Sequence, residues 1–263
     1  MMKNTRLSLI DFLRTVALVN MVAFHACYDH FVVYGANSNW DLLPATHVWQ
    51  QFIVLSFIFV SGMSFQLLSK SSLEQQNKQA NWLRPVRQGI KLLLLGEIIT
   101  LAILYFLPSE EIHYGVLTFM GLAVLLTSTL ENHTWQILNK LPSTIGIVLC
   151  TLLFILTYQT QYGLASFFTW KIAKWPEWIY AQNYALLGFP SKEFFSTDYV
   201  PLLPHIFMYW LGFYTYSFMQ AKAPELLASC NWERFNRFGR HTLAIYLVHQ
   251  PLLLGLLFLL ERN

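Results

Sequence analysis

The chain has 263 residues, and its charged residues make up only 12%, against roughly 25% in an ordinary soluble domain. A soluble globule is therefore excluded. Hydrophobic residues reach 55% and aromatic residues 16%, a mixture typical of hydrocarbon-spanning helices with aromatic belts at the interfaces. The formal net charge of +3 is too small to indicate a nucleic-acid partner.

A helix needs about 20 apolar residues to cross the bilayer, and only helices or closed barrels satisfy the backbone there. Seven stretches qualify as helical spans in chain order: Leu7–Cys27, Val48–Leu68, Gly89–Leu107, Gly115–Leu130, Leu141–Tyr162, Leu202–Met219 and Thr242–Leu260. Residues 163–201 are rich in Trp and Tyr and predict an amphipathic segment at the interface rather than another span. The predicted fold is an all-α, polytopic membrane helix bundle of about seven spans, in a single domain over residues 1–263.

The basic residues predict the orientation of the chain. With the N-terminus in the cytosol, 13 of the 17 Lys and Arg residues fall on or near the cytosolic side. They are Lys3, Arg6, Arg14, Lys70, Lys78, Arg84, Arg87, Lys91, Lys140, Lys222, Arg234, Arg237 and Arg240. The positive-inside rule therefore favours a cytosolic N-terminus and a C-terminus on the far side.

The first span carries two pairs of ionisable residues, and such groups inside a membrane are functional hypotheses by default. Asp11 and Arg14, three residues apart, either lock helix packing or form a cytosolic port for an anionic ligand. His25 and Asp29, four residues apart, share one face at the outer end. A carboxylate bonded to one imidazole nitrogen leaves the other able to take a proton from a hydroxyl or amine. The alternative for this second pair is helix capping or packing.

Other polar residues in the spans have structural interpretations. His249 and Gln250 precede Pro251 in the last span, where either side chain could satisfy a carbonyl freed by the proline, at a kink. Gly62, in the pair Ser61-Gly62 of the second span, predicts a close approach of two helices. Glu97 in the third span requires a partner or water.

Two basic rims flank the predicted spans on the cytosolic side. Arg84, Arg87 and Lys91 precede the third span at helical spacing, and Arg234, Arg237 and Arg240 do the same before the last. They are either positive-inside anchors or a clamp for a phosphate-bearing donor, which Arg binds bidentately. The three cysteines, Cys27, Cys150 and Cys230, have neither metal-ligand nor redox spacing, so we expect no metal site.

Five stretches in order resemble the bacterial branch of the heparan-alpha-glucosaminide N-acetyltransferase catalytic-domain family, within a superfamily of transmembrane acyltransferases. The likeness covers most of the chain. The stretches are Asp11–Asp29, which includes Asp11-Phe12-Leu13-Arg14 and Phe24-His25, then Arg87–Leu92, Ile112–Leu117 with Gly121-Leu122, Asp198–Pro204 and Gly239–Pro251.

The resemblance implies a multi-pass protein of the bacterial inner membrane that moves an acyl group, acetyl in the first instance, from cytosolic acyl-CoA to a glycan or lipid-linked acceptor on the far side. In the lysosomal members an Asn matches His25, and the histidine implicated in catalysis lies in the following loop, where this chain has His30. The bacterial branch is more similar in His25 and Asp29, which we expect to be catalytic.

The predicted site thus has two parts. His25 and Asp29 would act on the thioester, and the donor would be held by basic residues: Arg14, Arg84, Arg87, Lys91 and Arg240. Two other classes remain open, a small proton-coupled transporter using the same buried charges and a non-catalytic membrane subunit. In the outer loop, Trp170, Trp175 and Trp178 would either stack on sugar rings or form an interfacial belt.

Overall fold

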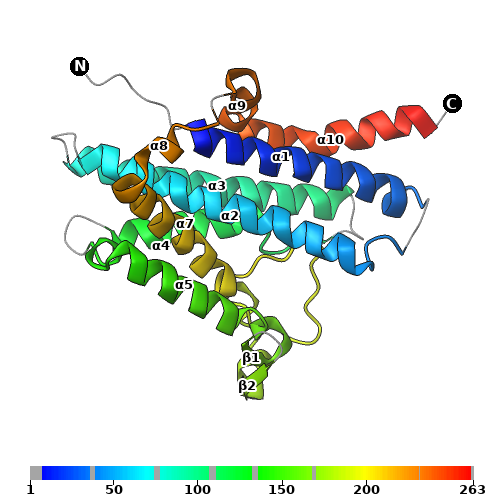
Figure 1. Ribbon diagram of the computed structural model, residues 1–263. Coiled ribbons are helices and arrows are strands. Elements are labelled where there is room, and N and C mark those ends of the chain that lie inside the picture. The colour runs from blue at the N-terminus through cyan, green and yellow to red at the C-terminus, as the bar shows by residue number, and fades with distance from the viewer. Residues whose placement is uncertain are drawn as a thin grey trace. The chain divides into compact units, whose positions relative to one another are not determined.

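The structure is a computed structural model, which describes residues 8–35, 39–73, 78–106, 111–131, 136–167, 170–230 and 232–261. Its elements are mostly helical (Figure 1). The helices are α1 (Ser8–Tyr28), α2 (Pro44–Leu73), α3 (Lys78–Phe106), α4 (Val116–Leu130), α5 (Ser143–Thr157), α6 (Glu177–Ala181), α7 (Leu202–Lys222), α8 (Pro224–Leu227), α9 (Glu233–Arg240) and α10 (Thr242–Glu261). The strands are β1 (Leu164–Phe167) and β2 (Trp170–Lys174).

Five helical segments of the described chain are long and apolar enough to cross a membrane, which indicates an integral membrane protein. They are Ser8–Val33, Pro44–Ser69, Leu83–Phe106, Ser143–Tyr162 and Thr242–Leu260, and each overlaps a predicted span. The fourth predicted stretch is the apolar helix α4, whose 15 residues reach only about 22 Å. The sixth, α7, is helical but is not among the five. Seven spans, and the sides of the two termini, stay predictions.

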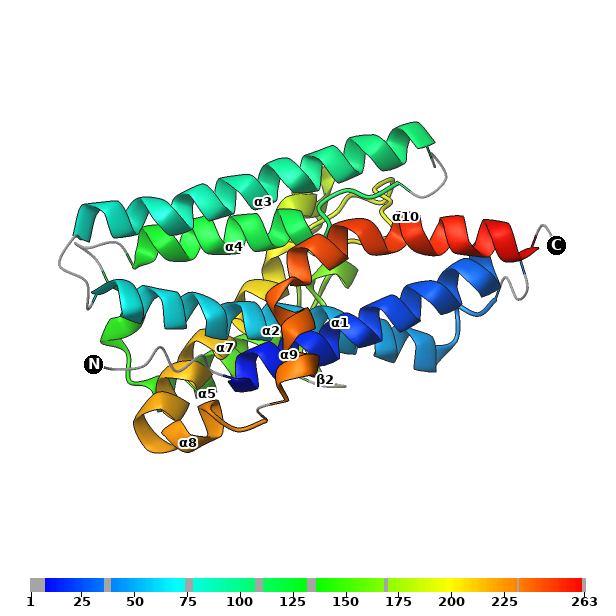
Figure 2. The same cartoon turned by 90° about the horizontal axis from the view of Figure 1, so that it is seen from above.

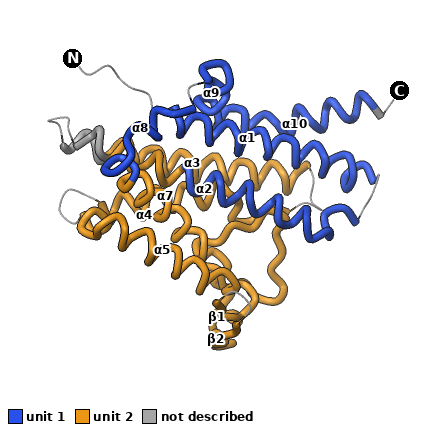
Figure 3. The backbone as a smooth tube through the Cα atoms, viewed as in Figure 1, with its two compact units in different colours: residues 1–60, 219–263 blue, residues 61–218 orange. Residues whose placement is uncertain are grey.

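The chain divides into two compact units (Figure 3), of which unit 1 comprises residues 1–60 and 219–263 and unit 2 comprises residues 61–218. Both α2 and α7 contribute residues to each unit because the boundaries fall within them. A single domain over residues 1–263 stays a prediction.

In unit 1, α9 and α10 both pack along α1 (Figures 1 and 2). Gly239 lies so close to α1 that a Cβ atom there would collide with the Asp11 carbonyl oxygen. Thr15 occupies the same contact, where its hydroxyl donates to the carbonyl of Phe235 at 3.1 Å and accepts from the Gly239 N–H at 2.9 Å. The close approach of backbones therefore sets how α9 meets the beginning of α1.

The second half of α1 packs against the beginning of α2 within unit 1. Leu18, Met21, Phe24 and Ile53 form a buried apolar cluster. Asn20 accepts a hydrogen bond from the Trp49 indole N–H at 3.1 Å and donates to the carbonyl of Val16 at 2.9 Å, so this polar side chain holds two helices together.

In unit 2, α3 and α4 lie side by side (Figures 1 and 2), with Gly89 and Gly121 at the point of closest approach. The second half of α2 packs on α7 at Gly62, where a Cβ atom would collide with the carbonyl oxygen of Tyr209. The packing role predicted for Ser61-Gly62 is thus confirmed, since only glycine leaves room for that carbonyl.

Replacing Gly62 by alanine is expected to lower the free energy of unfolding by about 1–3 kcal/mol, as overpacking does in a close-packed interior. Gly255 of α10 provides the control, because nothing lies within 4 Å of a Cβ atom added there. Denaturation by SDS in mixed micelles, followed by tryptophan fluorescence, measures both. Equal stability of Gly62→Ala and Gly255→Ala would contradict the helix contact.

Residues 163–201 differ from a purely helical prediction. β1 and β2 form an antiparallel hairpin, in which Phe167 pairs with Trp170, and α6 follows it with only five residues. The sequence from Trp170 to Lys174 alternates large apolar and charged residues at its start, a period that suits a strand. The all-α prediction is therefore corrected by one small hairpin, while the described part of this connection contains no helix long enough for a further span.

The three tryptophans of this region lie in different environments. Trp175 packs edge-to-face on Phe189, with ring centroids 5.4 Å apart, whereas Trp170 and Trp178 are exposed. Trp170 and Trp178 remain candidates for either a sugar platform or an interfacial belt, and Trp175 is occupied by internal packing.

Candidate active site

His25 and Asp29 lie at the end of α1, where the helix widens. The α-helical pattern ends at Tyr28, and a π-helical turn, η1, continues over Asp29–Val33. Such turns insert an extra residue into the helical repeat and are frequent at functional sites. The turn begins at Asp29, whose side chain is fully buried.

Asp29 receives its hydrogen bond from the last helix. The amide nitrogen of Gln250 donates to Oδ1 of Asp29 at 2.8 Å, which joins α10 to α1 within unit 1. The sequence predicts that the carboxylate of Asp29 bonds the imidazole of His25. Instead, Nδ1 of His25 is buried and has no hydrogen-bond partner in the structure, so Asp29 does not hold that nitrogen.

The imidazole of His25 contacts a second imidazole. Its ring centroid lies 4.9 Å from that of His249, with 60° between the planes. His249 is buried, and its Nδ1 lies 2.6 Å from the carbonyl oxygen of Tyr246. Two contacts therefore join the end of α1 to α10, one between His25 and His249 and one between Asp29 and Gln250.

From the sequence alone, His249 and Gln250 are predicted to be kink residues beside Pro251. His249 does bond a carbonyl of its own helix, whereas Gln250 binds Asp29 across to α1. Residues more than 200 positions apart carry no local signal of contact. The signal that could have found them is the presence of adjacent polar residues in an otherwise apolar span, which marks functional positions in membranes.

The basic residues predicted for donor binding fall into two sets. In unit 1, Asp11 accepts from Arg14 at 3.2 Å through one oxygen and from Arg240 at 3.3 Å through the other. Arg240 also reaches Glu233 at 3.3 Å. The Asp11–Arg14 pair predicted from sequence is present, and Arg240 extends it.

The second set lies on α3 in unit 2. Arg84, Arg87 and Lys91 are all exposed at its beginning. Glu97, further along the same helix, is exposed as well, beside the exposed residues Leu94 and Ile98. Arg84, Arg87 and Lys91 take no part in the ion pairs described above. Each of them can therefore bind an anionic ligand without first breaking one of those ion pairs.

Two further stretches of the family resemblance meet in unit 2. Ser196 accepts from the backbone N–H of His113 at 2.9 Å and donates to its carbonyl at 3.0 Å. Val200 donates its N–H to the Tyr114 carbonyl at 3.0 Å. Asp198 accepts from the N–H of Val116, the first residue of α4, and so caps that helix. Burial raises the pKa of Asp198, and the bond from Val116 offsets part of the rise.

Replacing Asp198 by asparagine is expected to raise stability at pH 7 and to leave it unchanged at acidic pH. A raised pKa in the folded state means that stability is full below the unfolded value near 3.8 and falls as pH rises through the folded value. Asparagine stays neutral and keeps an oxygen acceptor for Val116, so it escapes this loss.

Thermal unfolding midpoints of Asp198→Asn and wild type, compared at pH 7 and pH 4, test this expectation. Asp41→Asn removes an exposed carboxylate and serves as the control. A variant that is less stable than wild type at pH 7, but not at pH 4, would show that the charged cap stabilises the fold.

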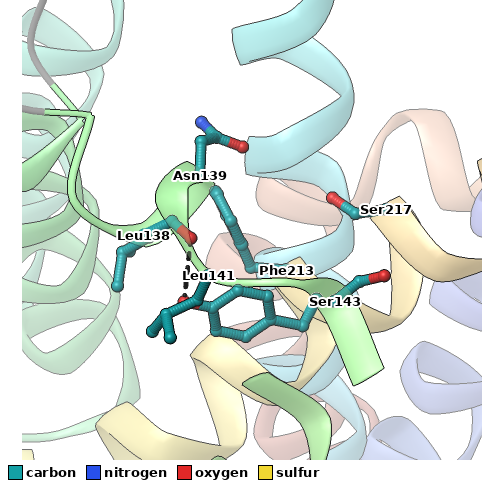
Figure 4. A pocket seen from close by; sticks show the side chains of 7 residues that line it. Leu138, Asn139, Leu141, Ser143, Phe213 and Ser217 are labelled. Carbon is teal, nitrogen blue, oxygen red and sulfur yellow. Dashed lines mark hydrogen bonds between the residues drawn. The ribbon is translucent and has the colours of Figure 1, made fainter. Parts of the chain in front are cut away.

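A pocket of about 240 Å³ opens in unit 2 between η3 (Leu138–Lys140), α5 and α7 (Figure 4). It is lined by Leu138, Asn139, Leu141, Ser143, Phe213, Tyr214 and Ser217. The Tyr214 hydroxyl donates to the Leu138 carbonyl at 3.0 Å, which closes one wall. The volume is below the roughly 300 Å³ of the smallest typical ligand sites, and no residue of the predicted site lines it.

Among the described residues, no group of three or more His, Cys, Asp and Glu side chains is placed to hold a metal ion. Two imidazoles, a buried carboxylate and an amide can accept, donate and orient protons.

Comparison with known proteins supplies the family. Residues 6–251 match the family described as heparan-alpha-glucosaminide N-acetyltransferase, catalytic. No curated protein and no solved structure matches the chain. The match covers nearly the whole chain, from before the beginning of α1 to Pro251 in α10. The chain therefore belongs to the heparan-alpha-glucosaminide N-acetyltransferase catalytic family, a family of membrane acetyltransferases.

Proposed function

We propose that this protein takes an acyl group, acetyl in the first instance, from cytosolic acyl-CoA and transfers it to a glycan or other acceptor across the membrane. The observation that carries the proposal is the pair of contacts, His25 with His249 and Asp29 with Gln250, in a chain of this acetyltransferase family. Ionisable groups buried inside a membrane are costly, so they are rare there and mark functional positions.

In the proposed reaction the thioester lies beside His25. In the direct route, the acceptor's hydroxyl or amine loses its proton as its oxygen or nitrogen attacks the thioester carbon. The C–S bond then breaks, and the thiolate takes a proton to give free CoA. In the relay route, a nitrogen of His25 attacks the thioester carbon first, the C–S bond breaks, and the thiolate takes a proton and leaves as CoA. The acceptor's oxygen or nitrogen then attacks the acyl carbon, the C–N bond to His25 breaks, and the acceptor's proton passes to the imidazole. In either route Asp29 has a positioning role, since its bond from Gln250 holds α10 against the end of α1.

Turnover of labelled acetyl-CoA by the detergent-purified protein tests the function. Transfer to glucosamine, release of acetate or retention of label on the protein would each support an acetyltransferase. Label that is retained on the wild type and lost in His25→Ala would favour the relay route. Proteoliposomes that take up solute without any acyl turnover would favour the transporter, and failure of both assays would favour a non-catalytic subunit.

For the donor, we propose that Arg84, Arg87 and Lys91, together with Arg14 and Arg240, contact the phosphates of acyl-CoA. The support is the charge and exposure of the α3 residues and the preference of arginine for bidentate phosphate binding. At Arg14 and Arg240 a phosphate would have to compete with Asp11, which both already bind.

Replacing Arg84, Arg87 or Arg240 by glutamine is expected to weaken acetyl-CoA binding about tenfold each, the loss of one charge-assisted bond of roughly 1.4 kcal/mol. Isothermal titration with acetyl-CoA measures the affinity. Lys171→Gln is the control, since Lys171 is an exposed cation of β2 that belongs to neither basic rim. Affinities equal to that of the control would identify the three arginines as membrane anchors.

A further inference from the structure

Three polar atoms of the cluster on α1 and α10 are buried without a hydrogen-bond partner. They are Nδ1 of His25, Nε2 of His249 and Oε1 of Gln250. Buried polar side-chain atoms are nearly always satisfied, so each exception requires an explanation. Because the three belong to side chains of one cluster, the explanation they share is a polar group of a ligand that binds there.

The tautomer of His249 follows from its hydrogen bond. Nδ1 lies 2.6 Å from the Tyr246 carbonyl oxygen, and a carbonyl can only accept. Nδ1 therefore carries a proton. In the neutral imidazole, a proton on Nδ1 leaves Nε2 with a lone pair and no proton. A base needs this arrangement, in which one nitrogen is fixed as donor and the other left open to accept.

No comparable bond fixes Nδ1 of His25. That nitrogen has no hydrogen-bond partner, and the carboxylate one turn away is held by Gln250. Of the two imidazoles in contact, His249 is the one whose open nitrogen is defined by the fold. The titratable groups whose rings face His249 are His25 from α1 and Tyr246 from α10, with centroids 4.9 Å and 5.7 Å from its own. Asp29 of η1 bonds the adjacent residue Gln250.

We infer that His249 is the general base of the transfer, with Nε2 accepting the proton of the acceptor's hydroxyl or amine as that group attacks the acyl carbon. The inference rests on the proposed function. In the direct route the C–S bond breaks, and the imidazolium of His249 gives its proton to the departing thiolate, which leaves as CoA. In the relay route the C–N bond of acyl-His25 breaks, and the proton passes from His249 to the departing imidazole.

His249→Gln separates catalysis from packing. A glutamine amide can donate to the Tyr246 carbonyl, as Nδ1 does, but it has no basic nitrogen. We expect this variant to bind acetyl-CoA as wild type does and to lose about 10²–10⁴-fold in turnover, the usual contribution of general acid–base catalysis. Val248→Ala, at an exposed neighbouring position, is the control and is expected to turn over at the wild-type rate.

The experiment uses the full chain in detergent, with acetyl-CoA as donor and glucosamine as acceptor probe, and records CoA release. His249→Ala is assayed in parallel with added imidazoles of graded basicity, and rates that rise with basicity support a base. Turnover of His249→Gln within threefold of wild type would overturn the inference, as would an His249→Ala variant that binds acetyl-CoA but is not rescued. Absence of turnover in the wild type would instead refute the proposed function.

Discussion

His25→Ala is expected to reduce acyl-CoA-dependent transfer about 10²–10⁴-fold, the range for loss of a group that acts on the reacting atoms. The imidazole lies against His249 at the end of α1, with a buried nitrogen open to a ligand. Alanine removes the side chain that the thioester would approach, whereas the Asp29–Gln250 bond can still join α1 to α10. CoA release from acetyl-CoA, with folding checked by thermal unfolding, measures the loss.

His30→Ala is the matched control for this prediction. His30 is exposed in the π-helical turn five residues further on, and it lies in the loop where the resemblance to lysosomal relatives places a catalytic histidine. We expect its replacement to leave the rate near that of the wild type. If His30→Ala abolished transfer and His25→Ala did not, the catalytic imidazole would be the one in the loop.

The second large effect is expected at the other end of α1. Asp11→Ala should lower the free energy of unfolding by about 2–3 kcal/mol. Removing one partner of a fully buried ion pair costs roughly 3–5 kcal/mol, and the effect here is smaller because both arginines are partly exposed. Asp11 is only 14% exposed and bonds Arg14 and Arg240 through separate oxygens. Its removal takes the shared carboxylate away from both guanidinium groups and leaves Arg240 with Glu233. Denaturation by SDS in mixed micelles measures the change.

Glu233→Gln is the control, since the Glu233 side chain is 78% exposed and exposed ion pairs contribute little. Acetyl-CoA affinity of Asp11→Ala adds a second result. If Arg14 and Arg240 hold donor phosphates, removal of the competing carboxylate should tighten binding. Unchanged affinity with lowered stability would mean that these two arginines lock α1 to α9 and take no part in donor binding.

The membrane class, most of the helices and the family resemblance were all accessible in the sequence, because long apolar runs and their aromatic and basic flanks are local properties. Gly62 illustrates the same point, since a small residue in a span signals a close helix contact without naming the partner. The hairpin at Leu164–Lys174 was missed, because strands of four and five residues are too short to outweigh an aromatic-rich context.

Which polar groups meet was beyond the reach of the sequence. Spacing along α1 placed His25 and Asp29 on one face, yet Asp29 bonds Gln250 and His25 contacts His249, both from the far end of the chain. Arg240 likewise joins Asp11 across more than 200 residues. Hydrogen bonds and ion pairs act over a few ångströms, so their partners are chosen by how helices pack in space, and no periodicity within one helix records that choice.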